Sequence, residues 1–262
     1  MSMQTVMFTD TIFGPIQSRR LGTSLGVNLS PRDGKVCSFD CLYCEAGFNA
    51  QGQGTTGLPG REEVARLLEE KLAKMKADGD HLDVITFSGN GEPTVNPDFP
   101  EIIADTMALR DKYFPNVKVS VLTNSTMLES KRVVDALRSV DNCLLKLDSA
   151  VDSTISMLDR PVSPHFNAER VINHLSYFGS KGVIQTMFTR GTHNGETVDN
   201  TTDVEVDALI DAYNRIRPRE IMIYSLDRPS PEANLCKVPR EELDRIAERI
   251  FASTGIPVSA VG

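Results

Sequence analysis

The chain has no long apolar segment, and it has too few cysteines for a disulfide framework. No run in its 262 residues approaches the ~18 consecutive apolar residues that a membrane-spanning helix needs. Residues 1–10 lack a basic region followed by an apolar core, so we expect neither a secretory signal nor a membrane partner. The five cysteines are odd in number and unevenly spaced, which is typical of a reducing, cytoplasmic compartment.

The sequence also lacks the positive charge of a protein that grips nucleic acid by its phosphates. Its formal net charge is −8 at pH 7, whereas phosphate-binding surfaces are basic. This balance argues against an extensive RNA-binding surface. A local basic patch stays open, because residues 11–36 contain one acidic residue against Arg19, Arg20, Arg32 and Lys35.

Short apolar strands alternate with amphipathic helices along the whole chain. With 40% hydrophobic and 24% charged residues, the composition is that of an ordinary globular domain. The patterns predict strands over residues 24–30, 84–88, 117–123, 143–148, 183–189, 220–225 and 257–261, and helices over 61–77, 99–113, 129–140, 167–181, 203–216 and 241–253. This alternation predicts an α/β protein with a parallel sheet and right-handed crossovers.

Three cysteines follow the first expected strand with the spacing C-x3-C-x2-C, at Cys37, Cys41 and Cys44. Thiolates this close in sequence can converge on one metal centre. A tetrahedral zinc site normally takes four protein ligands, and the sequence offers no fourth Cys or His nearby. A 4Fe–4S cluster has four irons to ligate, so three cysteines leave one iron open to a substrate or cofactor. Three unrelated buried thiols are the alternative, which the spacing disfavours.

This spacing resembles the signature of the radical S-adenosylmethionine (SAM) superfamily, where the residue before the last cysteine is usually aromatic, as Tyr43 is. The resemblance implies a partial (β/α)6 TIM-like barrel that fills residues 1–262 as a single domain, with one 4Fe–4S cluster. It implies that SAM chelates the open iron and is cleaved to methionine and a 5′-deoxyadenosyl radical, which abstracts hydrogen from a substrate. A reductant such as flavodoxin or ferredoxin would supply the electron.

The loop after the second expected strand, residues 88–94, reads S-G-N-G-E-P-T. Function lies at the carboxyl ends of the strands in a parallel barrel. Glycine lets backbone groups approach a ligand closely, and a glutamate offers an acceptor for an ammonium group. The loop resembles the superfamily's G-G-E-P motif, which holds the amino group of SAM, with Asn90 where the family usually has Gly. We therefore expect cofactor contacts from Gly89, Asn90, Gly91, Glu92 and Pro93.

Polar side chains also follow the third and fourth expected strands. In the superfamily, groups at these strand ends often contact the ribose and carboxylate of SAM, so the resemblance assigns Asn124, Lys146 and Asp148 to cofactor binding. The same resemblance places Tyr43 at the adenine. For Lys146 and Asp148, an ordinary salt bridge at a strand end is the alternative.

Arginines follow the last three main strands, at Arg160, Arg190 and Arg228. A guanidinium group bonds carboxylates and phosphates through two parallel hydrogen bonds. These residues therefore predict an anionic substrate, with Arg190 as its main contact. The sequence assigns no catalytic side chain.

The substrate stays open. Residues 13–15, 18–22, 89–94, 123–124 and 160–161 resemble the branch that includes the archaeal wyosine-synthesis enzymes of transfer RNA, without the cysteines of their second cluster. The length resembles that of glycyl-radical-enzyme activases. An RNA base, a protein and a small metabolite all remain candidates. A zinc-stapled binding module, completed by a distant ligand, is the alternative from another class, and Cys143 and Cys236 are expected to be structural thiols.

Overall fold

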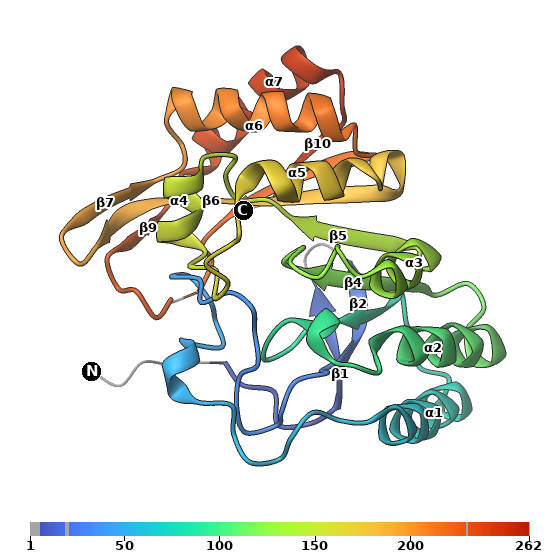
Figure 1. Cartoon of the computed structure of the whole chain (residues 1–262). Helices are drawn as coiled ribbons and strands as arrows, with labels where there is room; N and C mark the ends of the chain where they lie inside the picture. The colour runs from blue at the N-terminus through green and yellow to red at the C-terminus, as the bar shows by residue number, and fades with distance from the viewer. Residues whose placement is uncertain (1–5, 19–20, 229, 262) are drawn as a thin grey trace.

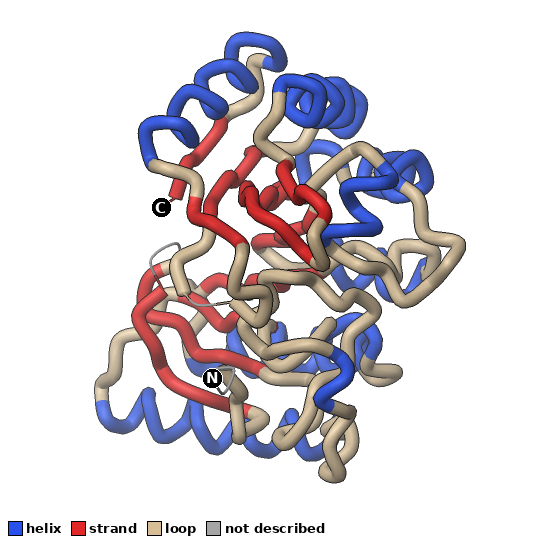
Figure 2. The backbone as a smooth tube through the Cα atoms, turned by 90° about the vertical axis from the view of Figure 1, so that its left-hand side faces the viewer, coloured by secondary structure: helices blue, strands red, loops and turns tan. Residues whose placement is uncertain are grey.

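The computed structural model shows strands that form one curved sheet, with the helices on its outer side (Figure 1). It describes residues 6–18, 21–228 and 230–261, so Arg19 and Arg20 lie outside the described residues. Figure 2 shows the same arrangement from the side, with the strands inside a layer of helices. None of the helices in these ranges is long and apolar enough to cross a membrane.

The sheet has the strand order β1-β2-β3-β4-β5-β6-β8-β10 and is not closed in the described residues. Pairing is parallel from β2 to β10, while β1 is antiparallel to β2. The strands are β1 (Ile12–Ser18), β2 (Gly22–Val27), β3 (Val84–Phe87), β4 (Lys118–Thr123), β5 (Asn142–Lys146), β6 (Gly182–His193), β7 (Glu196–Asp199), β8 (Glu220–Ser225), β9 (Leu235–Lys237) and β10 (Val258–Val261). The predicted partial barrel of parallel strands is confirmed.

The helices connect successive parallel strands and bury one face each against the sheet. In α1, the buried residues Val64, Leu68, Leu72 and Met75 recur at helical spacing, and the helix ends where Gly79 takes a left-handed conformation. The helices are α1 (Arg61–Asp78), α2 (Phe99–Tyr113), α3 (Lys131–Ser139), α4 (Asp152–Leu158), α5 (Ala168–Ser176), α6 (Asp203–Ile216) and α7 (Arg240–Thr254), with 3-10 turns η1 (Asn49–Gln51), η2 (Pro93–Val95) and η3 (Gly179–Lys181).

Besides β1, which precedes the first predicted strand, three short helices and strands were not predicted from the sequence. The helix α4 has seven residues, and the strands β7 and β9 have four and three, which is too short for a periodic pattern to show. β6 continues beyond the barrel and pairs with both of these strands in antiparallel fashion. The predicted helix over 167–181 ends at Ser176, and its last turn is the separate η3.

Alternation along the strands separates the core from the site. On β5, Cys143 and Leu145 pack in the main core, whereas Leu144 belongs to a small separate cluster with Val183 and Met222. Because successive side chains point to opposite faces, Lys146 shares the face of Leu144. This face lies inside the barrel, so the Lys146 side chain points to the interior, whereas Cys143 packs in the outer core.

Candidate cofactor site

A cavity of about 220 Å³ lies at the carboxyl ends of the parallel strands. It brings together all three cysteines of the motif and six of the nine residues expected to bind the cofactor, namely Tyr43, Gly89, Gly91, Glu92, Asn124 and Lys146. A second cavity, of about 240 Å³, shares Tyr43, Cys44 and Tyr224 with the first. The two cavities therefore adjoin.

The three thiols are free and lie along the cavity wall. Burial raises the pKa of the Cys37 thiol to about 12, and burial also raises the pKa of Cys41 well above its usual value. In residues 6–18, 21–228 and 230–261, no three His, Cys, Asp or Glu side chains are grouped so as to hold one metal ion. A four-iron cluster takes each thiolate on a different iron, so three soft donors spread along one cavity fit such a cluster better than a single zinc ion.

Residues 37–45, which we call the thiol loop, are paired with the segment that follows α4. Backbone hydrogen bonds run from Val162 N–H to Ser38 O (2.9 Å), from Asp40 N–H to Arg160 O (3.1 Å) and from Leu42 N–H to Leu158 O (2.9 Å). Phe39 and Pro161 form an isolated antiparallel bridge between the same two segments. The thiol loop is therefore held as one strand of a short ribbon, and α4 positions the other strand.

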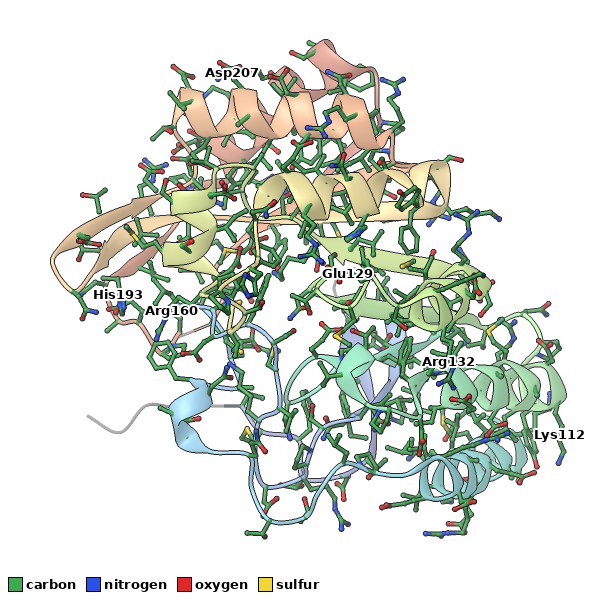
Figure 3. The ribbon with its side chains drawn as sticks, in the orientation of Figure 1. Lys112, Glu129, Arg132, Arg160, His193 and Asp207 are labelled. Carbon is green, nitrogen blue, oxygen red and sulfur yellow. The ribbon has the colours of Figure 1, made fainter. Side chains whose placement is uncertain are left out.

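The structure pairs each candidate substrate arginine with a carboxylate. Arg160 lies against the thiol loop (Figure 3), where its guanidinium group is 3.1 Å from Asp40 Oδ2. Arg228 binds Glu45 of the same loop at 2.6 Å, and Arg190 binds Glu242 at the start of α7. The structure thus does not bring the three arginines together as one anion site, because each guanidinium group is paired with a different carboxylate. Arg160 and Arg228 both pair with acidic residues of the thiol loop.

Residues 88–94, which we call the glycine loop, are tied to the end of β4 by Glu92. Its buried carboxylate accepts hydrogen bonds from Thr94 N–H (3.0 Å), the Thr123 hydroxyl (2.7 Å) and Asn124 N–H (2.6 Å). Burial raises the pKa of Glu92. A Cβ atom on Gly91 would lie 1.9 Å from Val36 O, so only glycine fits where this loop crosses the start of the thiol loop.

Three expected cofactor residues do not line the first cavity in the described part of the chain: Asn90, Pro93 and Asp148. The Asn90 side chain is fully buried and bonds to Phe8 and Pro31, so the prediction that it contacts the cofactor lacks structural support. Pro93 begins η2. Asn124 does line the cavity, with its amide nitrogen 2.9 Å from Ser38 Oγ and 3.6 Å from Cys37 Sγ.

A polar network lies beside the thiols, centred on Lys146, whose side chain is 16% exposed. Its ammonium donates to Tyr43 Oη (2.8 Å), Asp148 Oδ2 (3.2 Å) and Tyr224 Oη (3.3 Å). Burial opposes the charge on Lys146, but Asp148 and its other acidic neighbours together raise the pKa of the ammonium well above its usual value. The salt bridge between Lys146 and Asp148, which was the alternative reading of this pair, is therefore present, while Lys146 alone of the two also lines the first cavity.

Asp159 completes this network and was missed as a site residue. Its Oδ1 accepts from the Tyr43 hydroxyl (3.0 Å) and lies 3.6 Å from Cys41 Sγ. Burial, followed by the nearby Asp148 charge, raises the pKa of Asp159 well above its usual value. The one signal in the sequence was its place directly before Arg160. The helix α4, which ends at Leu158 and positions Asp159 beside the thiol loop, was not predicted.

An open barrel of parallel strands, with three thiols and a glycine-rich loop around one cavity at its strand ends, defines the class of protein. Residues 33–231 match the family described as the Radical SAM superfamily. This match covers more than half of the chain, which therefore belongs to the radical SAM superfamily of enzymes.

Curated relatives are similar over nearly all of the chain. A protein of Brachyspira hyodysenteriae named "GTPase Obg" is 25% identical over 250 residues, which make up 95% of this chain and 35% of that protein. A "UPF0026 protein" of Synechocystis sp. is 27% identical over 273 residues, covering 94% of each chain. Because the chain spans only about a third of the first relative, the activity in that relative's name belongs to that protein.

Among solved structures, a radical SAM methyltransferase from Sphaerobacter thermophilus has a TM-score of 0.65 to this chain at 18% identity. The similarity covers 91% of this chain and 65% of the methyltransferase. At this identity the likeness shows the shared fold alone.

Proposed function

We propose that Cys37, Cys41 and Cys44 hold one 4Fe–4S cluster and that SAM binds the iron left without a protein ligand. The observation that carries the proposal is the single cavity shared by the three thiols, the glycine loop and Lys146. When bound, the cluster supplies the electron that cleaves SAM to methionine and a 5′-deoxyadenosyl radical, which abstracts hydrogen from the substrate.

The chain's own residues bind and orient the cofactor. Glu92 Oε2 receives one hydrogen bond, from Asn124 N–H, and a carboxylate oxygen has a second acceptor site for the SAM ammonium. Lys146 presents a positive charge to the cavity wall and suits the SAM carboxylate. Asp148 holds Lys146 in place through its Oδ2, while its Oδ1 accepts from Met187 N–H at 2.9 Å.

The second cavity is the place we propose for the substrate. It adjoins the first at Cys44 and is lined by apolar residues of the late strands, such as Met187, Leu226 and Val261. Its charged residues include Arg228, which is paired with Glu45, so the structure gives no support for a specifically anionic substrate. A small molecule, an RNA base and a protein remain the candidates.

The cofactor chemistry also implies partners and a compartment. We propose a one-electron reductant such as flavodoxin or ferredoxin. A reducing, cytoplasmic compartment would suit it, and Cys37, Cys41, Cys44, Cys143 and Cys236 are all free thiols. The zinc-stapled module is the weaker alternative, because the thiols are not grouped around one point in the described residues.

Anaerobic incubation of the iron-loaded protein with SAM and dithionite tests this function. We expect slow formation of 5′-deoxyadenosine, and faster formation when a cell extract supplies the substrate. Chromatography with mass detection measures the product, and fractionating the extract would identify the substrate. Iron-loaded protein that forms no 5′-deoxyadenosine in either condition would contradict the proposal.

A further inference from the structure

Residues 6–9, which we call the N-terminal strap, connect two loops of the cofactor site. At one end, Val6 N–H donates to Glu45 O at 2.8 Å, one residue beyond Cys44. Two residues later, the backbone of Phe8 is bonded to Asn90 in the glycine loop. The strap therefore joins the thiol loop to the glycine loop, although the two loops are far apart in sequence.

Asn90 holds the strap through both backbone groups of Phe8. Phe8 N–H donates to Asn90 Oδ1 at 2.8 Å, and Asn90 Nδ2 donates back to Phe8 O at 2.8 Å. This exchange of two bonds is what a hydrogen-bonded residue of an antiparallel strand would make. The other N–H of Nδ2 donates to Pro31 O at 2.9 Å, and the side chain is 0% exposed. The hydrogen bonds of the Asn90 amide thus go to the strap and to Pro31, which lies before the thiol loop.

The strap also packs on the sheet through the side chain of Phe8. The ring of Phe8 stacks on that of Phe13 in β1, with 3.9 Å between the ring centroids and 20° between the planes. Phe13 in turn covers Gly26 of β2, where an added Cβ would lie 2.1 Å from the ring. These contacts fix the strap independently of the hydrogen bonds, so each set of contacts can be removed separately.

Asn90 stands where the related motif has glycine, which has no side chain to hold a strap. We propose that Asn90 is a positioning residue, which acts through the strap to fix the thiol loop relative to the glycine loop. The effect on SAM binding rests on the proposed function. The effect on the two loops does not, because their contacts exist in the chain itself.

The test is Asn90→Gly, compared with wild type by hydrogen–deuterium exchange of the cluster-free protein. Losing the hydrogen bonds to Phe8 should speed exchange in residues 6–10 by roughly tenfold. Residues 40–48 of the thiol loop should exchange faster as well. Phe8→Ala, which keeps the backbone bonds and removes the ring stacking, should change both segments in the same direction.

Asn96→Gly is the matched control. Asn96 is also a buried amide, and its Nδ2 donates to two backbone carbonyls, Leu29 O (3.3 Å) and Pro59 O (3.0 Å). It has no contact with the strap among those bonds, so its loss should leave exchange in residues 6–10 unchanged. An equal effect of the control would show general destabilisation and overturn the proposal.

Two further outcomes would overturn it. Unchanged exchange in residues 6–10 of Asn90→Gly would show that Asn90 does not anchor the strap. Faster exchange there without any change in residues 40–48 would show that the strap does not position the thiol loop. In the iron-loaded variant we expect SAM to dissociate roughly tenfold faster. Wild-type protein that binds no SAM would contradict the proposed function, while the exchange data would still decide the role of Asn90.

Discussion

Replacing Cys41 by alanine is expected to remove the iron–sulfur cluster and all SAM cleavage above background. Cys41 is the most deeply buried of the three motif thiols, at 8% exposure, and its sulfur lies 3.6 Å from Asp159 Oδ1 in the polar network. Neither of the two cysteines outside the motif is placed to replace Cys41 as a cluster ligand. Cys143 is buried in the outer core, and Cys236 is exposed on β9.

Iron and sulfide analysis of anaerobically reconstituted protein measures this loss. Cys236→Ala is the control, because it removes an exposed thiol outside the motif and should keep wild-type iron content. A Cys41→Ala protein with wild-type iron would remove Cys41 from the ligand set. Circular dichroism should show the same helix content in both variants, so that loss of iron is not confused with unfolding.

Lys146→Met is expected to destabilise the protein by about 3–5 kcal/mol, because it leaves the Asp148 and Asp159 carboxyl groups without their cation. Lys146 bonds Asp148 directly, and both carboxyl groups are at most 2% exposed. The length of methionine suits the space left by the lysine stem, so the cost comes from the charge and not from a cavity.

Urea unfolding of the cluster-free protein measures the change in the free energy of unfolding. Lys131→Met is the control, since Lys131 forms an exposed pair with Asp135 and its loss should cost less than about 1 kcal/mol. Adding Asp148→Asn to Lys146→Met should restore part of the loss by removing one uncompensated charge. A loss below about 1 kcal/mol in Lys146→Met would contradict the structural role given to this network.

The sequence predicted the barrel and assigned the candidate site residues to its strand ends, because both follow from local patterns. The alternation of strands and helices predicted which loops follow the carboxyl ends of the strands. The cysteine spacing and the glycine loop then identified two of these loops as candidate parts of the site. Since carboxyl ends of parallel strands share one edge, Lys146 and Glu92 were expected at the same site, and both line it.

The pairing of the arginines could not be predicted in the same way. Whether Arg190 meets a substrate or Glu242 depends on where α7 begins in space, and no local pattern encodes that distance. The position of Asp159 likewise depends on the short helix α4. Asn90 was assigned to the cofactor from its place in a motif, yet its side chain points to a segment of the chain more than eighty residues earlier.

Electron paramagnetic resonance of the reduced protein, recorded with and without SAM, tests whether the three thiols hold a four-iron cluster with one open iron. We expect a cluster signal that changes when SAM is added, because SAM binds the cluster itself, and iron analysis of the same sample should give about four irons per chain. Colourless protein that holds one zinc ion per chain, or an iron–sulfur signal that SAM leaves unchanged, would contradict this assignment.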